Sequence, residues 1–231
     1  SMPELSDRQM RNRQPAQVHA LPAPARTAPV ATLPGYAELH CLTNFSFQRG
    51  ASTPEEMVDR AYQLGYSALA ITDECSVAGI VRAFVCLRDM ERKLADYEKK
   101  HPEEPPIPRN PDFRLLFGSE FRFERFKLVV IANDTEGWGN LCEFITAART
   151  TELPKGEYRV SWEESDVASL QRCQILFVPH RPPGQDLDTA TLHEDLMAAK
   201  ALYGDNLWLA LELFNELDDD LWFVGLVQAS E

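Results

Sequence analysis

The sequence has no apolar run close to the ~20 residues that a membrane-spanning helix needs, so no such helix is expected. None of its five cysteines falls in a C-x-x-C pair, which argues against a zinc knuckle. The N-terminus lacks the apolar core of a secretory signal, and an odd number of cysteines in such a chain is typical of reduced thiols. We therefore expect a cytoplasmic protein without disulfides or membrane contact.

Other common sites are also missing from the sequence. It contains no G-x-S-x-G motif, no P-loop and no G-x-G-x-x-G motif. Positive charge is scarce, with 23 Lys and Arg against 36 Asp and Glu and a formal net charge of −13. Because residues 1–34 sum to +2, the remainder carries −15 and should repel a phosphate backbone over most of its surface. Any nucleic-acid role would need a local basic patch or another part of a larger protein.

Two regions differ in composition. Residues 1–34 hold six of the sixteen prolines and little apolar periodicity, which predicts a disordered tail. From residue 35 onward, strands alternate with helices, and this order predicts an α/β fold with a mostly parallel sheet. We predict strands at 36–41, 67–72, 113–123, 127–133, 174–179 and 207–214, and helices at 53–65, 76–100, 135–150, 190–204 and 218–231. The strands at 113–123 and 127–133 could pair as a hairpin, and the strand expected after the last helix is missing, so we expect an incomplete sheet or barrel.

The helix predicted at 53–65 has the clearest start signals. Thr53 is a plausible N-cap, Pro54 suits the first helical position and Glu56 completes a capping box. Its predicted buried stripe consists of Met57, Ala61 and Leu64.

Acidic groups and imidazoles lie at or near the ends of several predicted strands. The carboxyl ends of parallel strands meet at one face, and imidazoles with carboxylates there suit a divalent metal ion. The residues concerned are His40, Asp73, Glu74, Glu120, His180 and Glu212.

Each of these residues also has a structural interpretation. Asp73 could cap the helix that starts near Ser76, and His40 could be a core histidine bonded to a backbone carbonyl. Glu120 and Glu212 could pair with Arg122 or another base, and His180 could simply occupy a loop. The spacing of these residues does not separate the alternatives.

Longer motifs point to a family. The stretches "YAELHCLTNFSFQRGASTPEEMVDRAYQLGYSALAITDECS", "FGSEFRF" and "KLVVIANDTEGWGNLCEFITAAR" resemble, in order, the opening of bacterial error-prone DNA polymerases of the C family, DnaE-like translesion enzymes of the ImuC type. The resemblance covers roughly residues 35–215. It implies a PHP (polymerase and histidinol phosphatase) domain over 35–231, a distorted (β/α) barrel that is incomplete at its C-terminus, with an insertion near 92–112.

The resemblance also implies a set of metal positions, matched one at a time. His40 matches the first histidine of the family's H-x-H motif, but Leu42 stands in place of the second. Asp73 is followed by Glu74 where the family has Asp-His, and Glu120 matches the later glutamate. We therefore expect His40, Asp73 and Glu120 to be vestigial metal positions, too few for a multinuclear centre, with no catalytic or cofactor-binding residue among the 231.

These observations lead to three hypotheses. In the first, the chain is the N-terminal PHP-domain fragment of an error-prone DNA-directed DNA polymerase that acts in damage-induced mutagenesis and translesion synthesis. The parent nucleotidyltransferase would use Mg²⁺ and contact DNA through other domains, with the sliding clamp and accessory translesion proteins as partners. The fragment would be a structural and interaction module that does not polymerise by itself. The alternatives are a free-standing metal-dependent PHP phosphoesterase and a non-catalytic adaptor.

Overall fold

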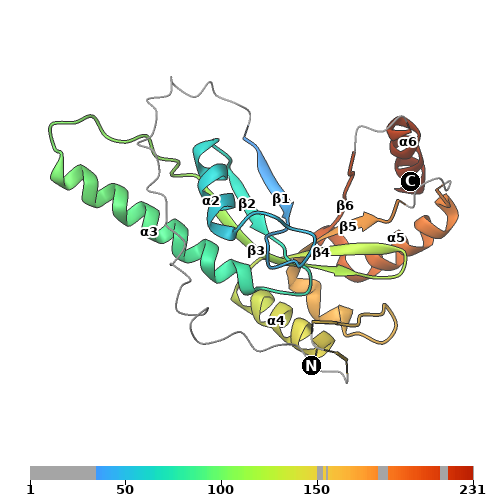
Figure 1. Ribbon diagram of the computed structural model, residues 1–231. Helices are drawn as coiled ribbons and strands as arrows, with labels where there is room; N and C mark the ends of the chain where they lie inside the picture. Colours follow the sequence, from blue (N-terminus) through green and yellow to red (C-terminus); the bar gives the residue numbers. More distant parts are fainter. Residues whose placement is uncertain (1–34, 150–152, 155, 182–186, 214–217, 231) are drawn as a thin grey trace, which may run out of the picture. The chain divides into compact units, whose positions relative to one another are not determined.

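The structure is a computed structural model, and it describes residues 35–149, 153–154, 156–181, 187–213 and 218–230. The predicted tail at 1–34 lies outside the described residues. A six-stranded sheet carries the fold, and its strands are adjacent in chain order from β1 to β6 (Figure 1). The strands are β1 (Ala37–Cys41), β2 (Ala68–Ile71), β3 (Arg114–Arg122), β4 (Phe126–Ala132), β5 (Cys173–Pro179) and β6 (Leu207–Leu209).

Helices connect and cover these strands. The described helices are α2 (Pro54–Gln63), α3 (Ala78–Lys100), α4 (Thr135–Arg149), α5 (Thr189–Tyr203) and α6 (Asp219–Ser230), with short 3₁₀ turns η1 (Val167–Arg172) and η2 (Gly204–Asn206). No helix in the described ranges is both long and apolar enough to cross a membrane.

The sheet is mixed. Its β1–β2, β2–β3 and β5–β6 pairs are parallel, whereas β3–β4 and β4–β5 are antiparallel. The β3–β4 hairpin confirms the one predicted from the sequence. The antiparallel β4–β5 pair was not predicted, and it makes the sheet less parallel than the alternation of elements suggested.

The sheet is also curled. His40 on β1 and Glu212, three residues after β6, are 172 residues apart in sequence and belong to opposite edges of the strand order. Their side chains nevertheless lie 3.0 Å apart. In a flat sheet β1 and β6 would be five strand spacings apart, so the edges must turn toward one another. The fold is α/β and has the form expected of an incomplete (β/α) barrel.

The predicted N-terminus of α2 is confirmed. The backbone N–H of Glu56 donates to the Thr53 hydroxyl at 3.2 Å, and the Glu56 carboxylate accepts from the Thr53 N–H at 2.9 Å. The predicted buried stripe is partly wrong, because Leu64 is 38% exposed and Val58 is fully buried. The helix packs against both α3 and β2, which rotates its buried face toward Pro54, Val58 and Ala61.

Three apolar clusters cover different parts of the described sheet, and the smallest consists of Ala70, Val129, Ile131 and Val178. Another packs α2 and α3 against β2, whose four residues are all buried, as the continuous apolar run predicted. The largest cluster packs α4, α5 and α6 against β3, β4 and β5, and includes Phe121, Leu128 and Phe177. The helices in the two larger clusters thus pack against the strands whose ends carry the polar residues.

Most predicted boundaries differ by one or two residues, and two of the differences bear on the site. α3 begins at Ala78 after Val77, which makes no side-chain capping bond, so the proposed cap by Asp73 is wrong. β6 stops at Leu209, well short of the predicted 214.

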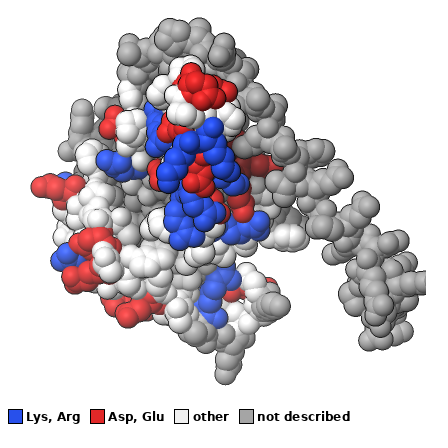
Figure 2. Space-filling view, turned by 90° about the vertical axis from the view of Figure 1, so that its left-hand side faces the viewer, with Lys and Arg blue, Asp and Glu red and all other residues white. Residues whose placement is uncertain are grey.

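Figure 2 views the molecule from the side on which α3 lies in Figure 1, and Lys and Arg are interleaved there with Asp and Glu. This face is therefore of mixed charge and is not the uniform basic patch that a nucleic-acid surface would need.

Candidate functional site

The candidate site forms where β1, β2 and β3 lie side by side. The backbone just after β2 continues along β3: the Glu120 N–H donates to the Asp73 carbonyl at 3.2 Å, and the Cys75 N–H donates to the Glu120 carbonyl at 2.8 Å. This parallel bridge pairs Glu74 with Glu120. Two carboxylates on neighbouring strands are thereby brought to one position, beside His40 on β1.

His40 lies between two carboxylates. Its Nε2 is 2.6 Å from Glu120 Oε2, and its Nδ1 is 3.0 Å from Glu212 Oε1. Burial disfavours protonation of the imidazole, but the hydrogen bonds to Glu120 and then to Glu212 outweigh it and raise the pKa of His40. An imidazolium donates from both nitrogens, so this arrangement satisfies the charged form. The alternative of a core histidine bonded to a backbone carbonyl is wrong.

Like Asp73, Glu120 is fully buried. Its side chain is 0% exposed, and besides His40 it contacts the guanidinium of Arg49, which reaches both carboxylate oxygens. Burial alone would raise the pKa of Glu120, but hydrogen bonds from His40 and Arg49 lower it to about 2. The sequence alternative was a pair with Arg122 or another base, and the base that Glu120 contacts is Arg49.

The Asp73 carboxylate binds residues of the loop that follows β1. This fully buried carboxylate accepts from the Thr43 N–H at 2.7 Å, the Thr43 hydroxyl at 2.8 Å and the Ser46 hydroxyl at 2.7 Å. These bonds tie the loop after β1 to the end of β2. A Cβ on Gly79 would lie 2.6 Å from Asp73 Oδ2, so the start of α3 approaches this carboxylate as closely as only glycine allows.

Glu74 faces the cluster and is held from both sides. Arg49 donates to its Oε2 at 2.6 Å, and the Tyr158 hydroxyl donates to its Oε1 at 2.9 Å. Its backbone N–H donates to the Ser46 hydroxyl at 3.0 Å. Burial is the main reason that the pKa of Tyr158 is raised, and the neighbouring Glu74 adds to it, so this hydroxyl stays a donor.

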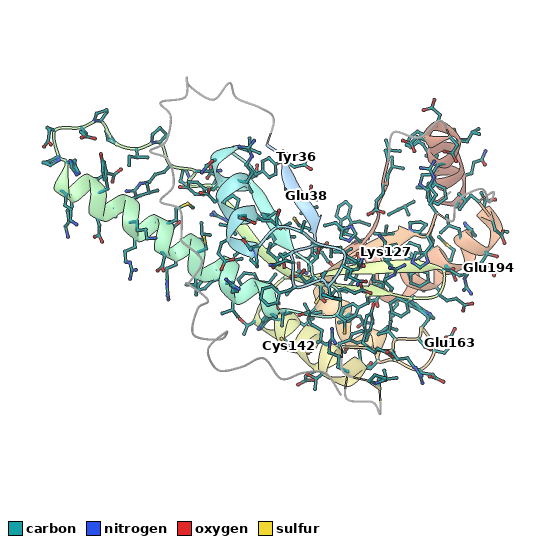
Figure 3. All side chains as sticks on the ribbon, in the orientation of Figure 1. Tyr36, Glu38, Lys127, Cys142, Glu163 and Glu194 are labelled. Carbon is teal, nitrogen blue, oxygen red and sulfur yellow. The ribbon has the colours of Figure 1, made fainter. Side chains whose placement is uncertain are left out.

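An open pocket of about 380 Å³ adjoins the cluster. Its lining includes Arg49, Arg122, Lys127, His180 and Glu212. Lys127 on β4, labelled in Figure 3, donates to Glu212 Oε2 at 3.3 Å. His180 follows β5 and bonds through Nδ1 to the Glu124 carbonyl at 3.1 Å.

Burial is the main cause of the lowered pKa of His180, so its imidazole is favoured in the neutral form. In the neutral form Nδ1 carries the ring proton and donates a hydrogen bond to the Glu124 carbonyl. His180 thus lines the pocket, and its hydrogen bond is to the backbone carbonyl of Glu124, in the turn between β3 and β4.

The donor set in this arrangement does not fit a multinuclear metal centre. Both oxygens of Asp73 and of Glu120 accept from protein donors, and both nitrogens of His40 contact carboxylates. Leu42 offers no ligand atom. Among the residues that the structure describes, no group of three or more His, Cys, Asp or Glu is arranged to hold a metal ion.

Of the three residues predicted as vestigial metal positions, His40 and Glu120 touch each other, whereas the Asp73 carboxylate bonds to the loop after β1. Sequence reasoning missed Arg49, Tyr158 and Lys127. Arg49 lies in a loop between Gln48 and Gly50, where no periodicity or spacing marks its partners. Only the order "SFQRG" within the longer family-like stretch could have drawn attention to it.

Comparisons with known proteins agree on one relationship. A family model described as PHP domain matches residues 38–176. An error-prone DNA polymerase of Azoarcus sp. (strain BH72) is 43% identical over 198 residues, which cover 82% of this chain and 18% of that protein. An error-prone DNA polymerase of Pseudomonas paraeruginosa is 42% identical over 193 residues, which cover 83% of this chain and 16% of that protein. The chain thus spans less than a fifth of the length of these relatives.

Proposed function

This chain belongs to the PHP domain family, and from that premise we propose that it is the PHP part of an error-prone DNA-directed DNA polymerase. The observation that supports this most is the long match to two proteins named error-prone DNA polymerase. They are 43% and 42% identical to this chain over about four fifths of its length. Because the match covers only a small share of each relative, the polymerase activity belongs to the longer protein.

The parent enzyme adds deoxynucleotides to a primer on a DNA template. Mg²⁺ bound outside these residues supplies charge stabilisation for that transfer. The test is primer extension with two samples: the 231-residue chain alone, and a longer protein that continues through the region present in the relatives. We expect extension with Mg²⁺ only from the longer protein. Extension by the 231-residue chain alone would contradict the proposal.

The fragment itself acts as a structural and interaction module with a degenerate metal site. This is supported by the hydrogen bonds that occupy Asp73 and Glu120 and by the aliphatic Leu42. A free-standing phosphoesterase would need open ligand positions, and the described donors leave few. Elemental analysis of the purified chain distinguishes the two functions. Two or more tightly bound metal ions per chain, lost in a His40→Ala variant, would favour the phosphoesterase.

We further propose that the parent acts in damage-induced translesion synthesis in the cytoplasm, together with the sliding clamp and accessory translesion proteins. The word error-prone in the names of the relatives supports this role. Pull-down of a purified clamp by the 231-residue chain, with a version starting at residue 35 for comparison, tests whether this module carries the contact. Absence of clamp binding in both versions would assign it to another part of the protein.

A further inference from the structure

The positively charged guanidinium of Arg49 lies where two neighbouring strand ends bring the carboxylates of Glu74 and Glu120 together. The Nη1 atom of Arg49 donates to Glu74 at 2.6 Å and also contacts Glu120, while Nη2 lies 3.4 Å from Glu120. One guanidinium therefore bridges the two strand-end acids. The Glu120 side chain is fully buried, and those of Glu74 and Arg49 are 22% and 27% exposed.

These acids need a positive charge between them. Glu74 and Glu120 are paired across a parallel bridge, and two carboxylates that share a poorly solvated position repel each other unless one is protonated or a cation lies between them. A metal ion and a guanidinium are alternative ways to supply this charge, and only the guanidinium is covalently part of the chain.

The loop that contains Arg49 forms a tight turn. Ser46 is tied to Asp73, and the backbone N–H groups of Arg49 and Gly50 both donate to the Ser46 carbonyl at 3.0 Å. A Cβ on Gly50 would lie only 1.9 Å from the Thr43 carbonyl oxygen, so the loop closes on itself more tightly than any other residue would permit. The turn thus fixes the backbone position from which the Arg49 side chain reaches the two carboxylates.

We propose that Arg49 replaces a bound metal ion, and that removing its side chain converts the cluster into a site for one divalent cation. The ligands would be His40, Glu74 and Glu120. These three are not arranged to hold an ion in the unchanged chain, and they would have to close on the space that the guanidinium leaves. One imidazole with two carboxylates suits Mn²⁺ or Zn²⁺. Arg49 and Glu212 line the pocket of about 380 Å³, and Glu212 is also the second partner of His40, so the pocket adjoins this position. The inference deepens the degenerate site proposed above and rests on that proposal.

The experiment compares the 231-residue chain with Arg49→Ala and Arg49→Gln variants. After removal of metals, Mn²⁺ or Zn²⁺ is titrated by calorimetry, and bound metal is counted by elemental analysis. We expect one ion per chain in both variants, with a Kd at least about tenfold below that of the unchanged chain. Adding Glu120→Gln to Arg49→Ala should abolish this gain, because it removes a charged ligand.

Two further variants serve as controls. Arg49→Lys keeps a positive charge at the position and should not gain metal binding. Arg82→Ala removes an exposed arginine that pairs with Glu55 away from the cluster, and it should bind metal no better than the unchanged chain.

The outcomes separate the two proposals. If Arg49→Ala and Arg49→Gln are folded by circular dichroism yet bind neither ion more tightly, the replacement of a metal by Arg49 is wrong, while the degenerate site stands. Tight binding of metal at His40 and Glu120 by the unchanged chain would instead refute the degenerate site. If both variants fail to fold, they are refolded with Mn²⁺ present: recovery of the native spectrum supports the proposal, and failure to recover refutes it.

Discussion

Replacing the buried Glu120 with glutamine should reveal how much the charge network of the site contributes to stability. The substitution keeps the size of the side chain and removes its charge. The pKa of Glu120 is lowered from 4.5 to about 2 by its contacts with His40 and Arg49, against the opposing effect of burial. At about 1.36 kcal/mol per pKa unit, this lowering corresponds to about 3 kcal/mol of folding free energy.

The sign of the pH dependence follows from the direction of this shift. A carboxyl whose pKa is lower in the folded state contributes stability above its unfolded pKa and loses that contribution as the pH falls toward its folded pKa. The contribution of Glu120 is therefore nearly complete at pH 5, at about 3 kcal/mol, and falls to about 1.4 kcal/mol at pH 3. In the unchanged chain, burial is outweighed by hydrogen bonds to Glu120 and Glu212, which raise the pKa of His40, so its imidazole is protonated at both pH values.

The assay is urea denaturation of the unchanged chain and of Glu120→Gln at pH 5 and pH 3. We expect the difference in unfolding free energy between them to shrink by about half between the two pH values. Glu143→Gln, which alters an exposed acid on α4, is the control and should change stability by less than about 0.5 kcal/mol at either pH. A difference for Glu120→Gln that is equal at pH 5 and pH 3 would refute the assigned network.

Three further changes test other parts of the site. Asp73→Ala leaves three buried donors unpaired and should lower the unfolding free energy by about 3 kcal/mol in urea, whereas a loss below about 1 kcal/mol would mean that the loop does not depend on this carboxylate. Gly50→Ala should cost about 2 kcal/mol or more in thermal unfolding, because its Cβ would collide with the Thr43 carbonyl, and an unchanged Tm would contradict the tight turn. A thiol reagent at pH 8 should modify Cys142, labelled in Figure 3, well before Cys75, which is fully buried and whose pKa burial raises to about 11; equal rates by mass spectrometry would oppose this.

The parts of the fold that were predictable depend on signals only a few residues long. The capping box of α2 uses Thr53 and Glu56, three positions apart, and it forms as predicted. The buried stripe of the same helix was partly misjudged, because whether Leu64 or Val58 turns inward depends on where α3 packs. The spacing within one helix carries no information about that distant partner.

The candidate site shows the same division. Parallel strands bring their carboxyl ends to one face, so the meeting of His40 with Glu120 could be expected from the strand positions alone. The partners of Asp73 could not, because the cap at Ser76 and the loop at Thr43 were both within reach of its short side chain. Arg49 was invisible for a similar reason, since an arginine in a loop can meet any acid that the fold brings near.

The amino-acid order by itself determined the succession of strands and helices, the hairpin between β3 and β4, and the membership of the PHP family, because these rest on local spacing and on long matching stretches. Only the tertiary structure decided which cation each acid meets. The curl of the sheet brings His40 to Glu212 across 172 residues, and the turn before Gly50 places the Arg49 charge between two strand ends. Electrostatic pairing acts over a few ångströms in space, so it follows the fold and not the distance along the chain.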